Sequence, residues 1–143
     1  KSNDKRKFLL LKKIETILSH KVKNKRISIL GVTFKPNTDD MRESLTLLMI
    51  PFLQKKGALI NYYDPSGEKK EFSNMKNVNF RENIYDACKK TDLVIIHTEW
   101  DEFKTIDFKK ISKGKKIKIY DLRNLYSPKK MKKMGINYHS IGR

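Results

Sequence analysis

Three cationic side chains stand in short polar segments where they could hold a phosphorylated ligand. Lys35, Arg42 and Arg123 lie in polar stretches that follow apolar runs of the chain. Lysine offers a compact positive charge, whereas the planar guanidinium of arginine matches pairs of phosphate oxygens. Residues of these types in turn segments therefore predict a site for a phosphate or diphosphate group.

Each distinctive polar residue also has a purely structural interpretation. Lys35 is one of 33 lysines and arginines and could be a solvated surface residue. Asp64 is expected to cap the turn in which it lies, and Trp100 to pack against the core. Two of the cations have acidic neighbours that could pair with them, namely Asp39, Asp40 and Glu43 for Arg42, and Asp121 for Arg123.

The other reactive residue types give no catalytic or metal-binding signature. The single cysteine, Cys88, lies between Ala87 and Lys89 with no motif that would activate it, which favours a buried structural role. The three histidines are far apart and lack metal-ligand spacing, and His97 is interpreted as a packing residue at a strand end. We expect neither a catalytic residue nor a metal site in this chain.

Apolar runs and turn residues predict a helix followed by alternating strands and helices. Residues 3–19 carry an apolar stripe at helical spacing. A helix capped by Ser44 is expected to be kinked or divided by Pro51 and to end at Gly57. The other helical segments are predicted at 83–90, at 101–113 as short turns, and from 128 to near 135; strands are predicted at 27–31, 58–63, 78–80, 93–97, 116–120 and 136–140.

This order predicts a doubly wound α/β domain with a mostly parallel, Rossmann-like sheet, preceded by an N-terminal helix. In such a sheet, ligands bind beyond the carboxyl ends of the strands. The first of these turns has one glycine, Gly31, followed by bulky residues rather than by the Gly-x-Gly-x-x-Gly of dinucleotide folds. The sheet is therefore predicted to lack a dinucleotide-binding loop, so that a diphosphate would need cationic side chains.

The composition restricts the partners. A formal net charge of +17 attracts anions, but the lysines are dispersed, and the chain has no aromatic RNA-binding signature and no zinc-finger spacing. We therefore expect no specific nucleic-acid partner. No apolar run approaches the length of a membrane span and no signal-peptide layout begins the chain, so we expect no membrane association. One cysteine cannot form an internal disulfide, which favours the cytoplasm.

Several segments resemble signatures of the UDP-glucose/GDP-mannose dehydrogenase family, in the order in which the family has them. Residues 31–44 read Gly-Val-Thr-Phe-Lys-Pro-Asn-Thr-Asp-Asp-Met-Arg-Glu-Ser and resemble the opening of the family's C-terminal domain. Similar segments follow at 56–58, 63–65, 98–103, 121–124 and 138–143. The resemblance covers the chain almost from end to end and is strongest to the bacterial UDP-glucose 6-dehydrogenase branch.

The resemblance implies roles for four residues. Phe34 and Lys35 match positions that contact the UDP-sugar, Phe34 through its backbone. Arg123 matches the arginine of the family's Asp-Gly-Arg motif, which binds the UDP-sugar, although Leu122 replaces the glycine here. Arg42 matches an arginine that reaches the NAD of the same active site. Cys88 does not match the family's catalytic cysteine motif.

The resemblance further implies an NAD-dependent enzyme that oxidises UDP-glucose to UDP-glucuronate for polysaccharide synthesis. In this family an N-terminal domain binds NAD, and a cysteine nucleophile forms a thioester with help from a lysine and an aspartate. We expect the NAD-binding and central domains to lie outside this chain, whose partners would then be the UDP-sugar and the rest of the same polypeptide. Residues 1–143 would form one C-terminal UDP-sugar-binding domain, with a leading helix and turn at 1–25 and an α/β core at 26–143.

Such a chain is expected to be inactive alone and to assemble as a homo-oligomer when full-length. Two alternatives stay open. The chain could be the same domain of a related dehydrogenase that acts on a UDP-N-acetyl-hexosamine or on GDP-mannose. It could also be a stand-alone module that binds nucleotide sugars or nucleic acid.

Overall fold

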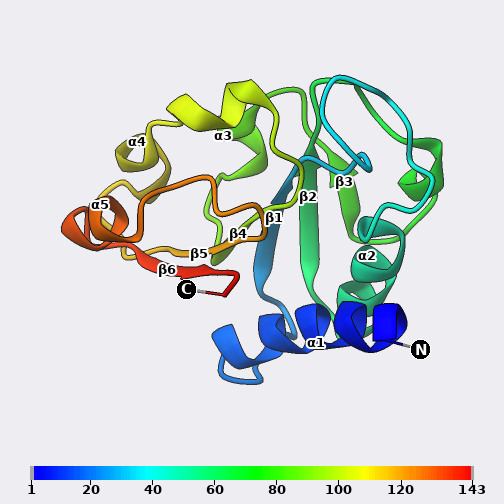
Figure 1. The fold of residues 1–143 in the computed structure, drawn as a ribbon, viewed down its shortest axis with the longest axis horizontal. Coiled ribbons are helices and arrows are strands. Elements are labelled where there is room, and N and C mark those ends of the chain that lie inside the picture. Colours follow the sequence, from blue (N-terminus) through cyan, green and yellow to red (C-terminus); the bar gives the residue numbers. More distant parts are fainter. Residues whose placement is uncertain (1, 143) are drawn as a thin grey trace.

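The computed structural model describes residues 2–142 and contains one sheet whose six strands are all parallel (Figure 1). In spatial order the strands are β3 (Val78–Phe80), β2 (Leu59–Tyr63), β1 (Arg26–Leu30), β4 (Leu93–Ile96), β5 (Lys118–Asp121) and β6 (Asn137–Ser140). The strand order reverses between β1 and β4, as in doubly wound folds, so the predicted fold class is confirmed. Lys1 and Arg143, the ends of the predicted 1–143 domain, lie outside the described residues.

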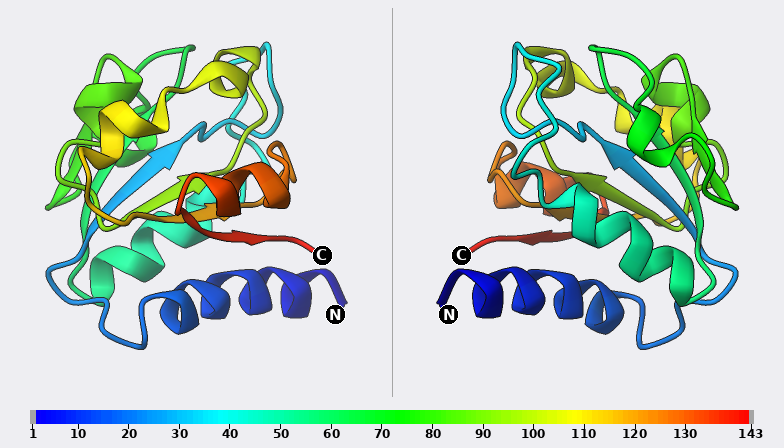
Figure 2. Two further views of the ribbon diagram at one scale, coloured as in Figure 1. Left: turned by 90° about the vertical axis from the view of Figure 1, so that its left-hand side faces the viewer. Right: turned by 90° about the vertical axis from the view of Figure 1, so that its right-hand side faces the viewer.

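Helices cover both faces of the sheet (Figure 2). One core lies beneath α1 (Ser2–Ile17) and α2 (Thr46–Lys55), and the other lies beneath α3 (Ile84–Ala87), α4 (Phe108–Ser112) and α5 (Pro128–Lys133). Two 3-10 turns, η1 (Lys70–Phe72) and η2 (Asp101–Thr105), complete the connections.

Strand residues alternate between these two cores, because successive side chains of a strand point to opposite faces. In β4, Leu93 and Ile95 belong to the core under α1 and α2, whereas Val94 and Ile96 belong to the core under α3, α4 and α5. All four are fully buried. This is why the strand reads as a continuous apolar run, as the sequence of a central parallel strand should.

The second helix differs from its prediction at its start. Leu45, not Ser44, is the N-cap of α2, and the Leu45 side chain makes no capping bond. The Ser44 hydroxyl nevertheless accepts from the backbone amide of Thr46, the first residue of α2, at 3.2 Å. It also donates a 2.6 Å hydrogen bond to the carbonyl of Val32, which fastens the helix to the turn after β1. Pro51 lies inside α2, which continues past it as one helix, and Gly57 follows its end with φ +88°.

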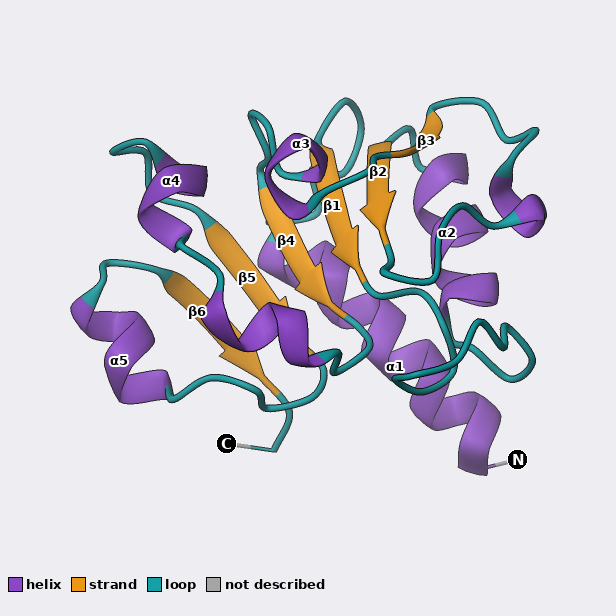
Figure 3. Ribbon diagram, turned by 90° about the horizontal axis from the view of Figure 1, so that it is seen from above, coloured by secondary structure: helices purple, strands orange, loops and turns teal. Residues whose placement is uncertain are grey.

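All strands run in the same direction, so the segments that follow β1, β2, β4 and β5 gather along one edge of the sheet (Figure 3). The N-terminal half of α1 reaches the same edge (Figure 3). The edge therefore combines four turns with one end of the leading helix.

α3 is shorter than the predicted helix over 83–90, because Asn83 caps it and Cys88 ends it.

Candidate functional site

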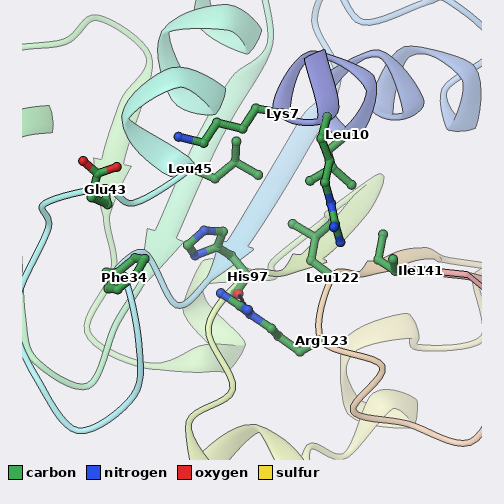
Figure 4. A pocket seen from close by; sticks show the side chains of 10 residues that line it. Lys7, Leu10, Phe34, Glu43, Leu45, His97, Leu122, Arg123 and Ile141 are labelled. Atoms are coloured by element: carbon green, nitrogen blue, oxygen red, sulfur yellow. Dashed lines mark hydrogen bonds between the residues drawn. The ribbon is translucent and has the colours of Figure 1, made fainter. Parts of the chain in front are cut away.

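A pocket of about 300 Å³ lies at the carboxyl edge of the sheet, between α1, the turn after β1 and the turn after β5 (Figure 4). Its apolar lining consists of Leu10, Phe34, Leu45, Leu122 and Ile141, and its polar lining of Arg6, Lys7, Glu43, His97 and Arg123. Two of the residues predicted to bind substrate, Phe34 and Arg123, are thus brought together in one pocket.

Arg123 is positioned by the turn that follows β5. The buried carboxylate of Asp121 accepts hydrogen bonds from the backbone amides of Arg123 at 3.0 Å, Leu125 at 2.7 Å and Tyr126 at 3.1 Å. The Nε of Arg123 donates to the backbone carbonyl of His97 at 2.6 Å. Asp121 therefore organises the backbone of the turn rather than forming an ion pair with the Arg123 side chain. In the part of the chain that the structure describes, the terminal nitrogens of this guanidinium have no partner and could bind a ligand.

Leu122 fits this turn without backbone strain. The left-handed backbone conformation falls on Asn124, with φ +51°, whereas Leu122 keeps an ordinary negative φ. The Leu122 amide donates to the carbonyl of Ile96 at 3.0 Å, and its side chain packs against the core under α1 and lines the pocket. Leu122 thus adds apolar surface to the pocket that Arg123 lines.

The first turn is closed by a carboxylate of the protein itself. One oxygen of buried Asp64 accepts from the backbone amides of Val32 at 2.8 Å and Thr33 at 3.2 Å. Its other oxygen accepts from the Ser66 amide at 2.9 Å, which confirms the predicted cap of its own turn. In a dinucleotide fold, amides at this turn face a pyrophosphate. Here they are already bonded, so this turn does not fit the pyrophosphate of NAD.

Gly31 and Thr98 bring the first turn and the turn after β4 into direct contact. A Cβ on Gly31, whose φ is +82°, would lie 2.6 Å from the Cβ of Thr98 and 2.8 Å from its backbone nitrogen. The Thr98 hydroxyl donates to the carbonyl of Thr33 at 2.8 Å. Trp100 packs against the core under α3, as predicted. The Thr98-Glu99-Trp100 segment thus joins two strand ends.

His97 is buried beside the pocket. Its Nδ1 lies 3.1 Å from the carbonyl of Gly31 and 3.0 Å from the Thr98 hydroxyl. Burial, together with the nearby charge of Arg123, lowers the pKa of His97 to about 3. The predicted packing role is confirmed, but the sequence did not indicate that this residue also lines the pocket and holds Arg123 through its carbonyl.

The turn after β1 carries the other predicted site residues. Phe34 lines the pocket and is 46% exposed, and its backbone amide donates to the carbonyl of Asp40 at 2.9 Å. Lys35 is exposed on the same turn and does not line the pocket.

Arg42 also lies outside the pocket. It pairs with Asp40 through two hydrogen bonds, of 3.1 Å from Nε and 3.0 Å from a terminal nitrogen. This is one of the acidic partners that the sequence suggested, and the bonds from Arg42 hold the pKa of Asp40 below its usual range. Phe34 and Arg123 therefore line the pocket, whereas Lys35 and Arg42 lie outside it.

Arg6 and Lys7 are pocket residues that the sequence did not reveal. They lie on α1, among many lysines of similar appearance. Only the packing of α1 across the strand ends places them beside Arg123, and helical periodicity does not predict that packing.

No group of three or more histidine, cysteine or acidic residues in the range 2–142 is arranged to hold a metal ion. Within the same range, no helix is long and apolar enough to cross a bilayer. Cys88 is buried, as predicted, and this burial raises the pKa of its thiol to about 12, which suppresses the reactive thiolate.

A doubly wound parallel sheet with a cationic pocket beyond its strand ends is the layout of an α/β nucleotide-binding domain. The model of the UDP-glucose/GDP-mannose dehydrogenase family, UDP binding domain, matches residues 28–128, and this chain belongs to that family. The resemblance of its motifs to that family is thereby confirmed.

Relatives with curated names include the UDP-glucose 6-dehydrogenase of Rhizobium meliloti, which is 36% identical over 142 residues that make up 99% of this chain and 32% of the relative. A UDP-glucose 6-dehydrogenase of Bacillus subtilis is 37% identical over 99% of this chain and 31% of the relative. The chain thus spans about a third of the length of these relatives.

Solved structures share the fold. A UDP-glucose dehydrogenase from Pyrobaculum islandicum superposes with a TM-score of 0.76 and 24% identity, covering 96% of this chain and 29% of that one. An NDP-N-acetyl-D-galactosaminuronic acid dehydrogenase from Methanosarcina mazei gives 0.78 and 21%, with the same coverage of both chains. At this identity the likeness concerns the fold alone.

Proposed function

We propose that this chain is the UDP-sugar-binding domain of an NAD-dependent UDP-glucose 6-dehydrogenase, an oxidoreductase that converts UDP-glucose to UDP-glucuronate for polysaccharide synthesis. The proposal is supported by family membership and by the names of the relatives that align with 99% of the chain. The structural observation that carries it is Arg123, which lies in a pocket beyond the strand ends and whose terminal nitrogens have no hydrogen-bond or ion-pair partner among residues 2–142.

Four residues receive roles in this proposal. Arg123 binds the diphosphate of the UDP-sugar, because charge-assisted hydrogen bonds from a guanidinium are strong and directional. Phe34, which lines the same pocket (Figure 4), contacts the ligand through its backbone. Lys35 and Arg42 lie on the exposed turn after β1, and we assign them to parts of the substrate and of NAD, respectively, that extend beyond the pocket.

The hydrogen bonds of the first turn argue against NAD binding at this turn. Because the amides of Val32 and Thr33 are bonded to Asp64, we propose that NAD is bound mainly by another domain of the full-length protein. That part would also supply the catalytic nucleophile, so residues 1–143 alone are inactive and depend on the rest of the polypeptide. The full-length protein would be a cytoplasmic homo-oligomer without a specific nucleic-acid partner.

Calorimetric titration of the chain with UDP, GDP and NAD tests the proposal. We expect saturable binding of UDP, with weaker binding of GDP and NAD, and no NADH formation from UDP-glucose and NAD. Tighter binding of GDP than of UDP would instead favour an enzyme that acts on GDP-mannose. Absence of UDP binding by the wild-type chain, with its fold verified by circular dichroism, would overturn the assignment.

A further inference from the structure

Three of the pocket's charged lining residues are cations and only one, Glu43, is acidic. Arg123 approaches from the turn after β5, whereas Arg6 and Lys7 belong to α1. Among the residues that the structure describes, no carboxylate forms an ion pair with Arg6 or Lys7. The pocket therefore has positive charge on two walls that come from opposite ends of the chain.

The leading helix is fixed firmly enough to present these side chains. Leu11, Ile14 and Ile17 bury its inner face against the sheet. The hydroxyl of Tyr120 donates to the carbonyl of Leu10 at 3.1 Å, and Lys118 donates to the carbonyl of Ile17 at 3.0 Å. Both contacts come from β5, the strand that leads to Arg123, so α1 and the Arg123 turn are tied to the same strand.

Helical geometry places Arg6 and Lys7 on the pocket side of α1. They precede Leu10 by four and three residues, and residues at these spacings share one face of a helix. Leu10 itself lines the pocket, and Figure 4 shows Lys7 extending above Leu45 on the side across from Arg123. Leu10, Leu45, Leu122 and Ile141 supply apolar lining that cannot hydrogen-bond an anion through its side chains, so a charged ligand is drawn to the cations.

We propose that Arg6 and Lys7 form a second cationic wall that binds the diphosphate of the nucleotide sugar from the side of α1, opposite Arg123. This inference rests on the proposed function and adds α1 to the binding site. The diphosphate then bridges the helix and the sheet edge. Both α1 residues line the pocket and contribute positive charge to it.

Single variants Arg6→Ala and Lys7→Ala test this wall, with Lys5→Ala as a matched control. Lys5 is exposed on the same helix and carries the same charge, but it does not line the pocket. Alanine favours helix, so α1 should stay intact, and circular dichroism verifies this. Each variant is titrated with UDP and with uridine, which has the same base and ribose but no phosphate.

We expect UDP affinity to fall about threefold to tenfold in Arg6→Ala and in Lys7→Ala, since both cations are partly solvated and screened. Uridine affinity should not change, and Lys5→Ala should leave both ligands unaffected. An equal loss of uridine and UDP affinity would show that the residues shape the pocket and would overturn a charge-based role.

Arg123→Ala separates this inference from the proposal on which it depends. If Arg123→Ala weakens UDP binding whereas Arg6→Ala and Lys7→Ala do not, the α1 wall is refuted and the proposed function stands. If the wild-type chain binds no UDP, the proposed function fails, and the α1 wall fails with it.

Discussion

The Nε of Arg123 donates a 2.6 Å hydrogen bond to the backbone carbonyl of His97, the residue that follows β4. This bond connects the ends of two neighbouring strands and fixes the direction of the guanidinium. Lysine has a single side-chain nitrogen and therefore cannot make this bond and present a separate terminal donor to a ligand, as arginine can. A positive charge alone therefore does not reproduce the geometry of this position.

Replacing Arg123 separates charge from geometry. Arg123→Ala should weaken UDP binding by roughly tenfold or more, because a charge-assisted contact is lost. Arg123→Lys should recover only part of this loss, since lysine restores a charge but neither the planar fork nor the bond to His97. Calorimetric titration with UDP measures both effects. Equal affinities of the Lys variant and the wild type would show that the bond to His97 has no role in binding.

The buried His97 should make the chain less stable below neutral pH. Its pKa is about 3 in the folded chain and near 6.5 in the unfolded chain, so between these values only the unfolded state binds the proton. The contribution of neutral His97 to the free energy of unfolding is complete above about pH 6.5. It falls as the pH decreases, by up to roughly 1.4 kcal/mol per pH unit. Urea unfolding between about pH 5 and 7, where carboxylates stay ionised, measures the slope.

One variant assigns that slope to His97. His97→Gln should flatten it, because the buried imidazole is removed. Burial and the nearby Lys13 and Lys118 also lower the pKa of His139, so a smaller slope of the same sign should remain in His97→Gln. An unchanged slope in His97→Gln would contradict the assignment.

Removing the Asp64 carboxylate should destabilise the fold strongly. Asp64→Ala leaves the buried amides of Val32 and Thr33 without their acceptor, at a cost of about 2–4 kcal/mol. Asp64→Asn should cost less, because it retains one carbonyl oxygen. Asp101→Ala removes the same charge from a side chain that is 92% exposed and serves as the control, with a change within about 0.5 kcal/mol. Urea unfolding at neutral pH measures all three variants.

Gly31→Ala should be far more damaging than a similar change at another glycine. Both Gly31 and Gly67 have a positive φ, so alanine costs about 1–2 kcal/mol of backbone strain at either position. Only at Gly31 does the new Cβ meet Thr98, whose backbone nitrogen cannot move aside easily. We expect Gly67→Ala to fold and Gly31→Ala to lose at least about 3 kcal/mol more or to remain unfolded. Comparable unfolding midpoints for the two variants would refute the contact.

Elements with strong local signals were predictable from the sequence. The apolar run at 93–97 and the alternation of strands with helices predicted β4 and the doubly wound sheet, which the structure confirms. The start of α2 was predictable only in part, because the N-cap is Leu45 although the Ser44 hydroxyl accepts from the first helical amide. The same hydroxyl donates to Val32, twelve residues earlier in the chain, and a contact of this kind is not visible in a local capping signal.

The site was predictable only in part, for the same reason. The rule that ligands bind beyond parallel strands placed Phe34 and Arg123 at one edge, where the structure has them together. Arg6, Lys7 and His97 escaped prediction, because their place in the pocket depends on how α1 packs and on how β4 aligns with β1. Lys35 and Arg42 were matched by motif, and their binding roles stay predictions.

The carboxylate of Asp64 has a consequence for redesign. This carboxylate accepts the hydrogen bonds of the amides in the first turn, so these donors are satisfied by the protein itself and need no bound ligand. Grafting a glycine-rich loop after β1 would therefore be insufficient to make this domain accept a dinucleotide. The graft would also have to remove the negative charge of Asp64, which repels a pyrophosphate, and to provide new acceptors for the amide and the hydroxyl of Ser66, which both donate to the same carboxylate.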